Sequence, residues 1–159
     1  MDQEALKQAL NLGKACQIGC VVKDLEATIK NYEEVLGMGP FMTATVKPER
    51  IFIDGRWVDE NTPSPVASGQ LTPELSIELI PMTASEMHKD FYDKHGEGMQ
   101  HIGFMTDDYD GVLQRAEKLG LPVMFSIEAS AEGVGHIRGT YFDTHPLTGV
   151  IFEVIEIKP

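Results

Sequence analysis

The stretch that decides the fold is Gln17-Ile18-Gly19-Cys20-Val21-Val22, which returns in the second half as His101-Ile102-Gly103-Phe104-Met105. Each copy is an apolar, strand-like run that is followed by aspartate and an amphipathic helix. Each half later places a glutamate inside an apolar strand, Glu78 in residues 75–80 and Glu153 in residues 150–155. Self-similarity at such a long period indicates a duplicated structural unit. The repeat therefore pairs Gln17 with His101 and Glu78 with Glu153, four residues able to bind a metal.

The bulk composition limits the class of protein. A chain of 159 residues fits one compact domain that two half-length modules share. The formal charge of -12 argues against nucleic acid and against an anionic membrane surface, because both attract clustered Lys and Arg. Cys16 and Cys20 lie too far apart along one strand for a disulfide and indicate a reducing compartment. With no recognisable signal peptide or apolar run of about 20 residues, we expect a cytoplasmic protein.

Hydrophobic periodicity predicts the elements of each half. In the first half we expect a short helix over 2–12, a strand over 14–22, a helix over 24–36, strand-like pieces at 42–46 and 50–58, a polar, proline-broken loop over 59–72 and a strand over 75–80. A helix capped by Ser85 then leads to the second half. There we expect a strand over 99–105, a helix over 108–119 and strands near 123–127, 136–141 and 150–157.

These elements predict an α+β fold in which two βαβββ modules pair into a curved mixed sheet around a metal-binding cavity. We divide the chain into an N-terminal helical extension (1–13), a first module (14–82), a helical connector (83–97) and a second module (98–159).

Strand alternation places the four paired residues on defined faces. Glu153 shares its face with Ile151 and Ile155, and a carboxylate between branched aliphatics needs a cation or a hydrogen-bond donor. Taken alone, Gln17 is more often a hydrogen-bonded strand residue, Glu78 is more often a half-exposed polar residue, and His101 is most often a packed imidazole. The repeat favours convergence, because two units that face each other across a pseudo-twofold axis bring all four together. Gly19 and Gly103 then either leave room beside a metal or merely permit close strand packing.

Four segments together resemble the vicinal oxygen chelate superfamily, which includes glyoxalase I, methylmalonyl-CoA epimerase, extradiol dioxygenases and bleomycin-resistance proteins. They are residues 17–26 (QIGCVVKDLE), 32–37, 95–104 (HGEGMQHIGF) and 149–154 (GVIFEV). The resemblance covers nearly all of the chain beyond Lys14. It places the family's metal ligands on Gln17, Glu78, His101 and Glu153. That ligand order is similar to human-type glyoxalases, whereas the surrounding sequence looks closer to the epimerases.

One imidazole nitrogen and three oxygen donors suit an octahedral divalent ion, which we expect to be Zn, Co, Ni, Mn or Mg. An extradiol iron site usually has two histidines and one carboxylate, so dioxygenase chemistry fits less well. Such an ion polarises a carbonyl and acidifies the adjacent C–H bond. Glu153 or Glu78 would then move the proton as the catalytic base and acid. The sequence therefore predicts a metal-dependent isomerase or epimerase, or a glyoxalase-type lyase.

The expected partner is a small carbonyl or acyl-thioester substrate, and the resemblance also implies a homodimer. The alternative is a non-catalytic protein of the same fold that binds a drug or metabolite. Candidate substrate-binding residues are Arg50, Trp57, Arg138 and Tyr141, with a solvated surface as the competing interpretation for Arg50 and Trp57. Glu49 is the nearest candidate for an additional acid or base, and His136 and His145 are interpreted as loop or pocket-rim residues.

Overall fold

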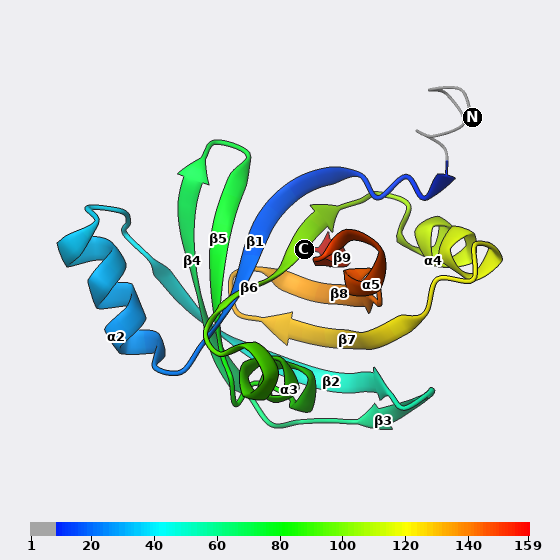
Figure 1. Ribbon diagram of the computed structural model, residues 1–159, viewed down its shortest axis with the longest axis horizontal. Helices are drawn as coiled ribbons and strands as arrows, with labels where there is room; N and C mark the ends of the chain where they lie inside the picture. Colours follow the sequence, from blue (N-terminus) through cyan, green and yellow to red (C-terminus); the bar gives the residue numbers. More distant parts are fainter. Residues whose placement is uncertain (1–8) are drawn as a thin grey trace.

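The computed structural model describes residues 9–159, so most of the helix predicted over 2–12 lies outside the described residues (Figure 1). The first half contains one helical region and five strands. They are β1 (Lys14–Val22), α2 (Leu25–Lys30) continued by the π-helical segment η1 (Asn31–Val35), β2 (Met42–Ile53), β3 (Arg56–Asp59), β4 (Ser64–Thr72) and β5 (Leu75–Pro81). The Asp24 carboxylate accepts a hydrogen bond from the backbone N–H of Ala27 and so starts α2 as an N-cap.

The second half repeats the order with four strands. Its elements are β6 (Gly98–Met105), α4 (Tyr109–Lys118), β7 (Val123–Ala131), β8 (Gly135–Phe142), the short α5 (His145–Thr148) and β9 (Ile151–Lys158). Between the halves lies α3 (Glu86–His95), which starts where the Ser85 hydroxyl accepts a hydrogen bond from the backbone N–H of His88. The helix capped by Ser85 is thus where the sequence predicted it.

The predicted loop over 59–72 is wrong in its second part, because Ser64–Thr72 forms strand β4. This strand is polar because alternate residues face solvent: Ala67 and Gly69 are buried, whereas Ser68 and Gln70 are exposed. The two strand-like pieces at 42–46 and 50–58 also differ from expectation, since the first piece is part of the continuous strand β2 (Met42–Ile53). The turn and β3 follow it as a hairpin. The first half therefore has one strand more than the second.

All strands belong to one mixed sheet in the order β3-β2-β4-β5-β1-β6-β9-β8-β7. The pairs β1–β5 and β6–β9 are parallel, and the remaining neighbours are antiparallel. An additional antiparallel pairing between β2 and β7 closes the sheet on itself, so that β3 alone lies outside the ring. The predicted α+β fold with a curved mixed sheet is confirmed, and the curvature goes as far as closure (Figure 1).

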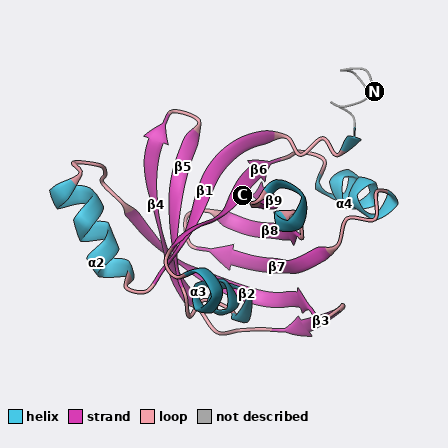
Figure 2. Cartoon of the chain, in the orientation of Figure 1, coloured by secondary structure: helices cyan, strands magenta, loops and turns pink. Residues whose placement is uncertain are grey.

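Helices α2 and α4 pack against the outside of this ring, and the strands make up most of the molecule (Figure 2). Helix α3 differs, because its Met87 packs on Phe125, Tyr141 and Ile151, and Tyr141 belongs to the inner face. Helix α4 buries Tyr109, Val112 and Ala116 against Phe142 and Val154. Helix α2 covers a second apolar cluster built mainly from β4 and β5. Within residues 9–159 no helix is long and apolar enough to cross a membrane.

Candidate metal centre

The two copies of the repeat lie side by side and antiparallel in the middle of the sheet. Strand β1 pairs with β6 so that Gln17 is opposite Gly103 and Gly19 is opposite His101. Each glutamine or histidine therefore faces the glycine of the other copy. This reciprocal register is what a pseudo-twofold axis between the two strands requires.

The glutamates join this arrangement through the parallel strands on either side. Glu78 on β5 pairs with Gly19, and Glu153 on β9 pairs with Gly103. Because cross-strand partners point to the same face of a sheet, both carboxylates lie on the face that carries Gln17 and His101. The four residues predicted from the repeat are thus brought to one place by strand register.

The side chains of these four residues converge on the Gln17 amide nitrogen. Gln17 Nε2 lies 2.9 Å from Glu78 Oε2, 3.3 Å from Glu153 Oε2 and 3.4 Å from His101 Nε2. His101 Nε2 is itself 3.3 Å from Glu153 Oε2 and 4.0 Å from Glu78 Oε2. The amide N–H groups neutralise part of the mutual repulsion between the two carboxylates by donating to both.

Three glycines make the space that these side chains occupy. A Cβ on Gly19 would lie 1.9 Å from His101 Cε1, and a Cβ on Gly103 would lie 2.6 Å from Gln17 Cγ. A Cβ on Gly139 of β8 would lie 2.6 Å from Glu153 Oε1. The missing side chain at Gly19 therefore leaves space for the His101 ring, and the missing side chain at Gly103 leaves space for Gln17.

The two carboxylates differ in their access to solvent. The Glu153 side chain is 6% exposed and that of Glu78 is 22% exposed, whereas His101 is fully buried. Burial, followed by the nearby charge of Glu153, raises the pKa of Glu78 to about 7, against a smaller lowering effect of His101 and Gln17. Near neutral pH the Glu78 carboxyl group therefore exchanges readily between its protonated and ionised forms.

Solvent reaches the site from the first half. Along one cross-strand row, Met42 on β2 pairs with Ser68 on β4, which pairs with Glu78. Met42 and Ser68 are exposed. On the other side, Glu153 pairs with Tyr141, a buried residue of β8. The row through Glu78 thus reaches open surface at Met42, whereas the separate row through Glu153 continues to the buried Tyr141.

The chemistry of the donor set fits a divalent metal. One imidazole, two carboxylates and a carboxamide are the ligands that octahedral Zn, Ni, Co, Mn or Mg sites combine. Among residues 9–159, the His, Cys, Asp and Glu side chains form no ready-made group of three around a metal position, although His101 Nε2 lies 3.3 Å from Glu153 and 4.0 Å from Glu78. The Gln17 Nε2 atom faces the carboxylates, and ligation requires the amide to turn so that Oε1 takes that position.

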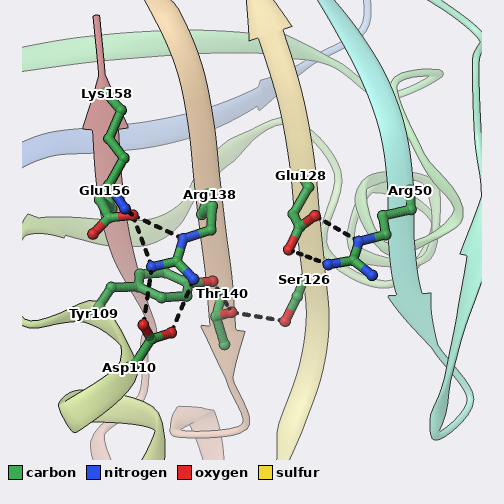
Figure 3. Close-up of polar contacts among 9 residues, drawn as sticks. All are labelled: Arg50, Tyr109, Asp110, Ser126, Glu128, Arg138, Thr140, Glu156 and Lys158. Carbon is green, nitrogen blue, oxygen red and sulfur yellow. Dashed lines mark hydrogen bonds and ion pairs between the residues drawn. The ribbon is translucent and has the colours of Figure 1, made fainter.

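Of the four predicted substrate-binding residues, only Tyr141 lies beside the site. Its ring is edge-on to His101 with the centroids 5.0 Å apart, and burial together with Glu153 and Glu78 raises the pKa of its hydroxyl well above the usual value. Arg138 lies on the opposite face of the sheet, where it stacks on Tyr109 and pairs with Asp110 and Glu156 (Figure 3).

Arg50 and Trp57 also lie away from the four residues. Arg50 forms a two-pronged ion pair with Glu128 across the seam between β2 and β7 (Figure 3). Its guanidinium also lies over the Trp57 ring. Glu49 lies on the same strand as Arg50 and is exposed, with His136 Nδ1 3.6 Å away. These residues form part of the surface.

His88 on α3 and Gln100 on β6 are two buried polar residues near the site that the sequence did not indicate. His88 Nδ1 lies 2.7 Å from the Ser85 hydroxyl, and burial, followed by the charge of His101, lowers the pKa of His88 to about 3. In the sequence, only the spacing of His88 from the helix-capping Ser85 could have pointed to this residue. Gln100 Oε1 lies 3.1 Å from Nδ1 of His101, its neighbour in sequence.

Two of the clefts on the surface of residues 9–159 are well formed, and neither of these two contains the four residues. The larger, about 790 Å³, lies between residues 9–13 and α5, remote from the repeat. The smaller, about 370 Å³, lies between α3, β7 and α5 and includes Gln100, Phe125 and Ile151 in its wall. Phe125 and Ile151 pack on Tyr141, so this second cleft is one layer of side chains from the site.

Comparison with known proteins places the chain in a family. Residues 16–137 match the model of the Glyoxalase/Bleomycin resistance protein/Dioxygenase superfamily, and the protein therefore belongs to this superfamily, the vicinal oxygen chelate superfamily. No curated protein matches the sequence.

Several solved structures share the fold. Methylmalonyl-CoA epimerase from Mycobacterium tuberculosis is 21% identical, with a TM-score of 0.62 over 92% of this chain and 89% of that one. A Streptomyces coelicolor methylmalonyl-CoA epimerase variant in complex with 2-nitronate-propionyl-CoA is 23% identical, with a TM-score of 0.66 over 92% and 99%. A hypothetical protein from Bacillus halodurans is 18% identical, with a TM-score of 0.64 over 92% and 95%. At these identities the likeness concerns the fold.

Proposed function

We propose that the protein is a metal-dependent enzyme that moves a proton next to a carbonyl group, as an epimerase or isomerase of an acyl thioester or as a glyoxalase-type lyase. The observation that carries this proposal is the convergence of Gln17, Glu78, His101 and Glu153 on one point. The epimerase structures with the same fold, one of them with a CoA ligand, support the acyl-thioester class.

In this proposal the four side chains hold one divalent ion. Bound there, the ion supplies Lewis-acid polarisation of the substrate carbonyl, which stabilises negative charge on that oxygen and acidifies the neighbouring C–H bond. The choice among Zn, Co, Ni, Mn and Mg is open, because the donor set accommodates each of them.

Glu78 is the residue best suited to move the proton. In the metal-free site the pKa of Glu78 is raised to about 7, and a bound cation would lower it, so Glu78 would act as the acid or base when it is loosened from the ion. Its side chain is also the more exposed of the two carboxylates and faces the open row of Ser68 and Met42. We assign to Glu153 the role of the second acid or base, which exchanges a proton with the substrate.

The buried side of the site has a different role. Tyr141 and His101 form a dry wall that keeps water from the reacting carbon and strengthens electrostatic interactions inside the site. A substrate would approach from the first module and place its reacting carbon between Glu78 and Glu153. The predicted homodimer and cytoplasmic location stay predictions.

The test is exchange of substrate hydrogen with solvent. Purified protein is analysed for bound metal and then incubated in deuterated water with 2-acyl thioesters and hemithioacetals, with exchange followed by NMR. We expect exchange that a chelator abolishes, and a rate about 10²–10⁴-fold lower in Glu153→Gln, the size typical for loss of a general acid or base. Glu74→Gln, an exposed glutamate before β5, is the matched control and should react at the wild-type rate.

Two results would contradict the proposal. Metal-loaded protein that promotes exchange in none of these compounds is not a proton-transfer enzyme of this class. Tight binding of a small molecule that persists after complete metal removal would favour the alternative, a non-catalytic binding protein of the same fold.

A further inference from the structure

The strand that carries His101 contains an irregularity just before this residue. In the β1–β6 ladder, Gly19 pairs with His101 and the next residue, Cys20, pairs with Met99. Gln100 is therefore an extra residue without a partner on β1, which is the definition of a β-bulge. Bulges re-aim side chains, so neighbours in sequence no longer point to opposite faces.

The bulge allows Gln100 to bond to the ring of its own neighbour. Gln100 Oε1 lies 3.1 Å from His101 Nδ1. Both side chains are almost completely buried, with Gln100 1% and His101 0% exposed. In this orientation of the amide, with Oε1 toward the ring, Nδ1 must carry a hydrogen, because two facing lone pairs would repel. Gln100 Nε2 is buried and has no hydrogen-bond partner among residues 9–159. His101 Nε2, which faces Glu153 and Gln17, is the other ring nitrogen.

We propose that Gln100 is a positioning residue that holds His101 in the Nδ1–H tautomer and presents the unprotonated Nε2 to the centre of the site. A histidine ligand needs a free ring nitrogen, and a hydrogen bond at the opposite nitrogen fixes both the tautomer and the ring orientation. The consequence for metal binding rests on the proposed metal centre, but the tautomer itself does not.

The pseudo-twofold arrangement provides an internal control. In the first copy the ladder skips Cys16 in the same way, since Ala15 pairs with Phe104 and Gln17 with Gly103. Cys16 thus occupies the bulge that precedes Gln17. Its thiol donates to the backbone carbonyl of Gly103, 3.5 Å away. A bulge therefore precedes both ligand positions, and the second copy uses it to orient a ring that has two possible tautomers.

The first test uses metal-free protein and ¹⁵N NMR of the His101 ring. We expect wild type to carry its hydrogen on Nδ1, and Gln100→Met, which keeps the length but removes the acceptor, to shift a large part of the population to Nε2–H. Gln100→Glu restores an acceptor and should restore the Nδ1–H form. Cys16→Ala, at the matched bulge, should leave the His101 tautomer unchanged.

The second test measures Co²⁺ or Zn²⁺ binding to the same variants. Loss of the partner that orients a ligating histidine typically weakens metal affinity about 10–100-fold, and we expect this for Gln100→Met but not for Cys16→Ala. Two results would overturn the proposal: wild-type His101 protonated on Nε2 without metal, or a folded Gln100→Met protein with the wild-type tautomer. Failure of the proposed enzyme function leaves the NMR result unaffected, so the two are distinguishable.

Discussion

The two halves of the molecule use one layout in two environments. Each half contributes a proposed ligand position, a glycine two residues later and a glutamate on the adjacent parallel strand. In the second half the residue beside the glutamate is Tyr141, which is buried, whereas in the first half it is Ser68, which is exposed. The duplication thus specifies where the four side chains meet, and the residues around them make one side of the site closed and the other open.

The helices of the two halves also differ in burial, and the helix of the second half is again the more buried one. Helix α4 of the second half buries Tyr109, Val112 and Ala116, whereas α2 of the first half has no buried residue. Burial of apolar side chains is the main favourable term in folding, so the second half contributes more stability per helix. In the proposed enzyme, the second half would be the firm half that positions His101, and the first half the looser half that admits substrate.

The largest effect on stability is expected from Gly19→Ala. The added Cβ would lie 1.9 Å from the ring of His101, which is fully buried and held by Gln100, so the ring has little freedom to move. Overpacking of this kind costs about 3 kcal/mol, the upper end of the usual range. Gly103→Ala meets the flexible Gln17 side chain at 2.6 Å and should cost less. Urea unfolding of both variants measures the difference, and equal losses would mean that the closed half is not the firmer one.

The raised pKa of Glu78, in the open first half, predicts that the stability of the protein depends on pH. The folded-state pKa of Glu78, about 7, is above the value of 4.5 for an unperturbed glutamate, so the folded state holds this proton more tightly. Its contribution to stability is present below pH 4.5 and is lost as pH rises through 7. In metal-free protein, Glu78→Gln should therefore increase stability at pH 8 by about 2–3 kcal/mol and leave it nearly unchanged at pH 4. Unfolding curves across this range measure the effect.

The exposed Glu74→Gln variant controls for the change of net charge. If Glu78→Gln were no more stable than wild type at pH 8, the carboxylate would be better solvated than its 22% exposed side chain indicates. A gain in stability together with lost exchange activity would be the trade-off expected of a functional site.

The smallest of the three effects compares the helices directly. Val112→Ala removes two methyl groups from a fully buried position in α4 and should cost about 1–2 kcal/mol. Ile29→Ala on α2 removes more atoms from a half-buried position and should cost no more than that. Thermal unfolding of the two variants gives the comparison, and a clearly larger loss for Ile29→Ala would reverse the assignment of the firm half.

The repeat made the centre of the fold predictable. Because a strand alternates with period two, matched positions in two copies determine which side chains share a face, and Gln17, Glu78, His101 and Glu153 follow from that rule. Strand β4 was missed because Pro63 and Pro65 interrupt its start and its alternate residues are polar. Gln100 was missed for the opposite reason: strict alternation places it on the far face from His101, and a bulge cannot be read from one sequence.

The ring closure between β2 and β7 has a consequence for either half of the chain taken by itself. The two halves adhere along two separate seams, one between β1 and β6 and one between β2 and β7. A half-chain on its own would therefore expose two unpaired strand edges, and unpaired edges pair readily with strands of other molecules. A second copy of the half-chain would cover both edges, and joining the two copies in one polypeptide makes this pairing intramolecular.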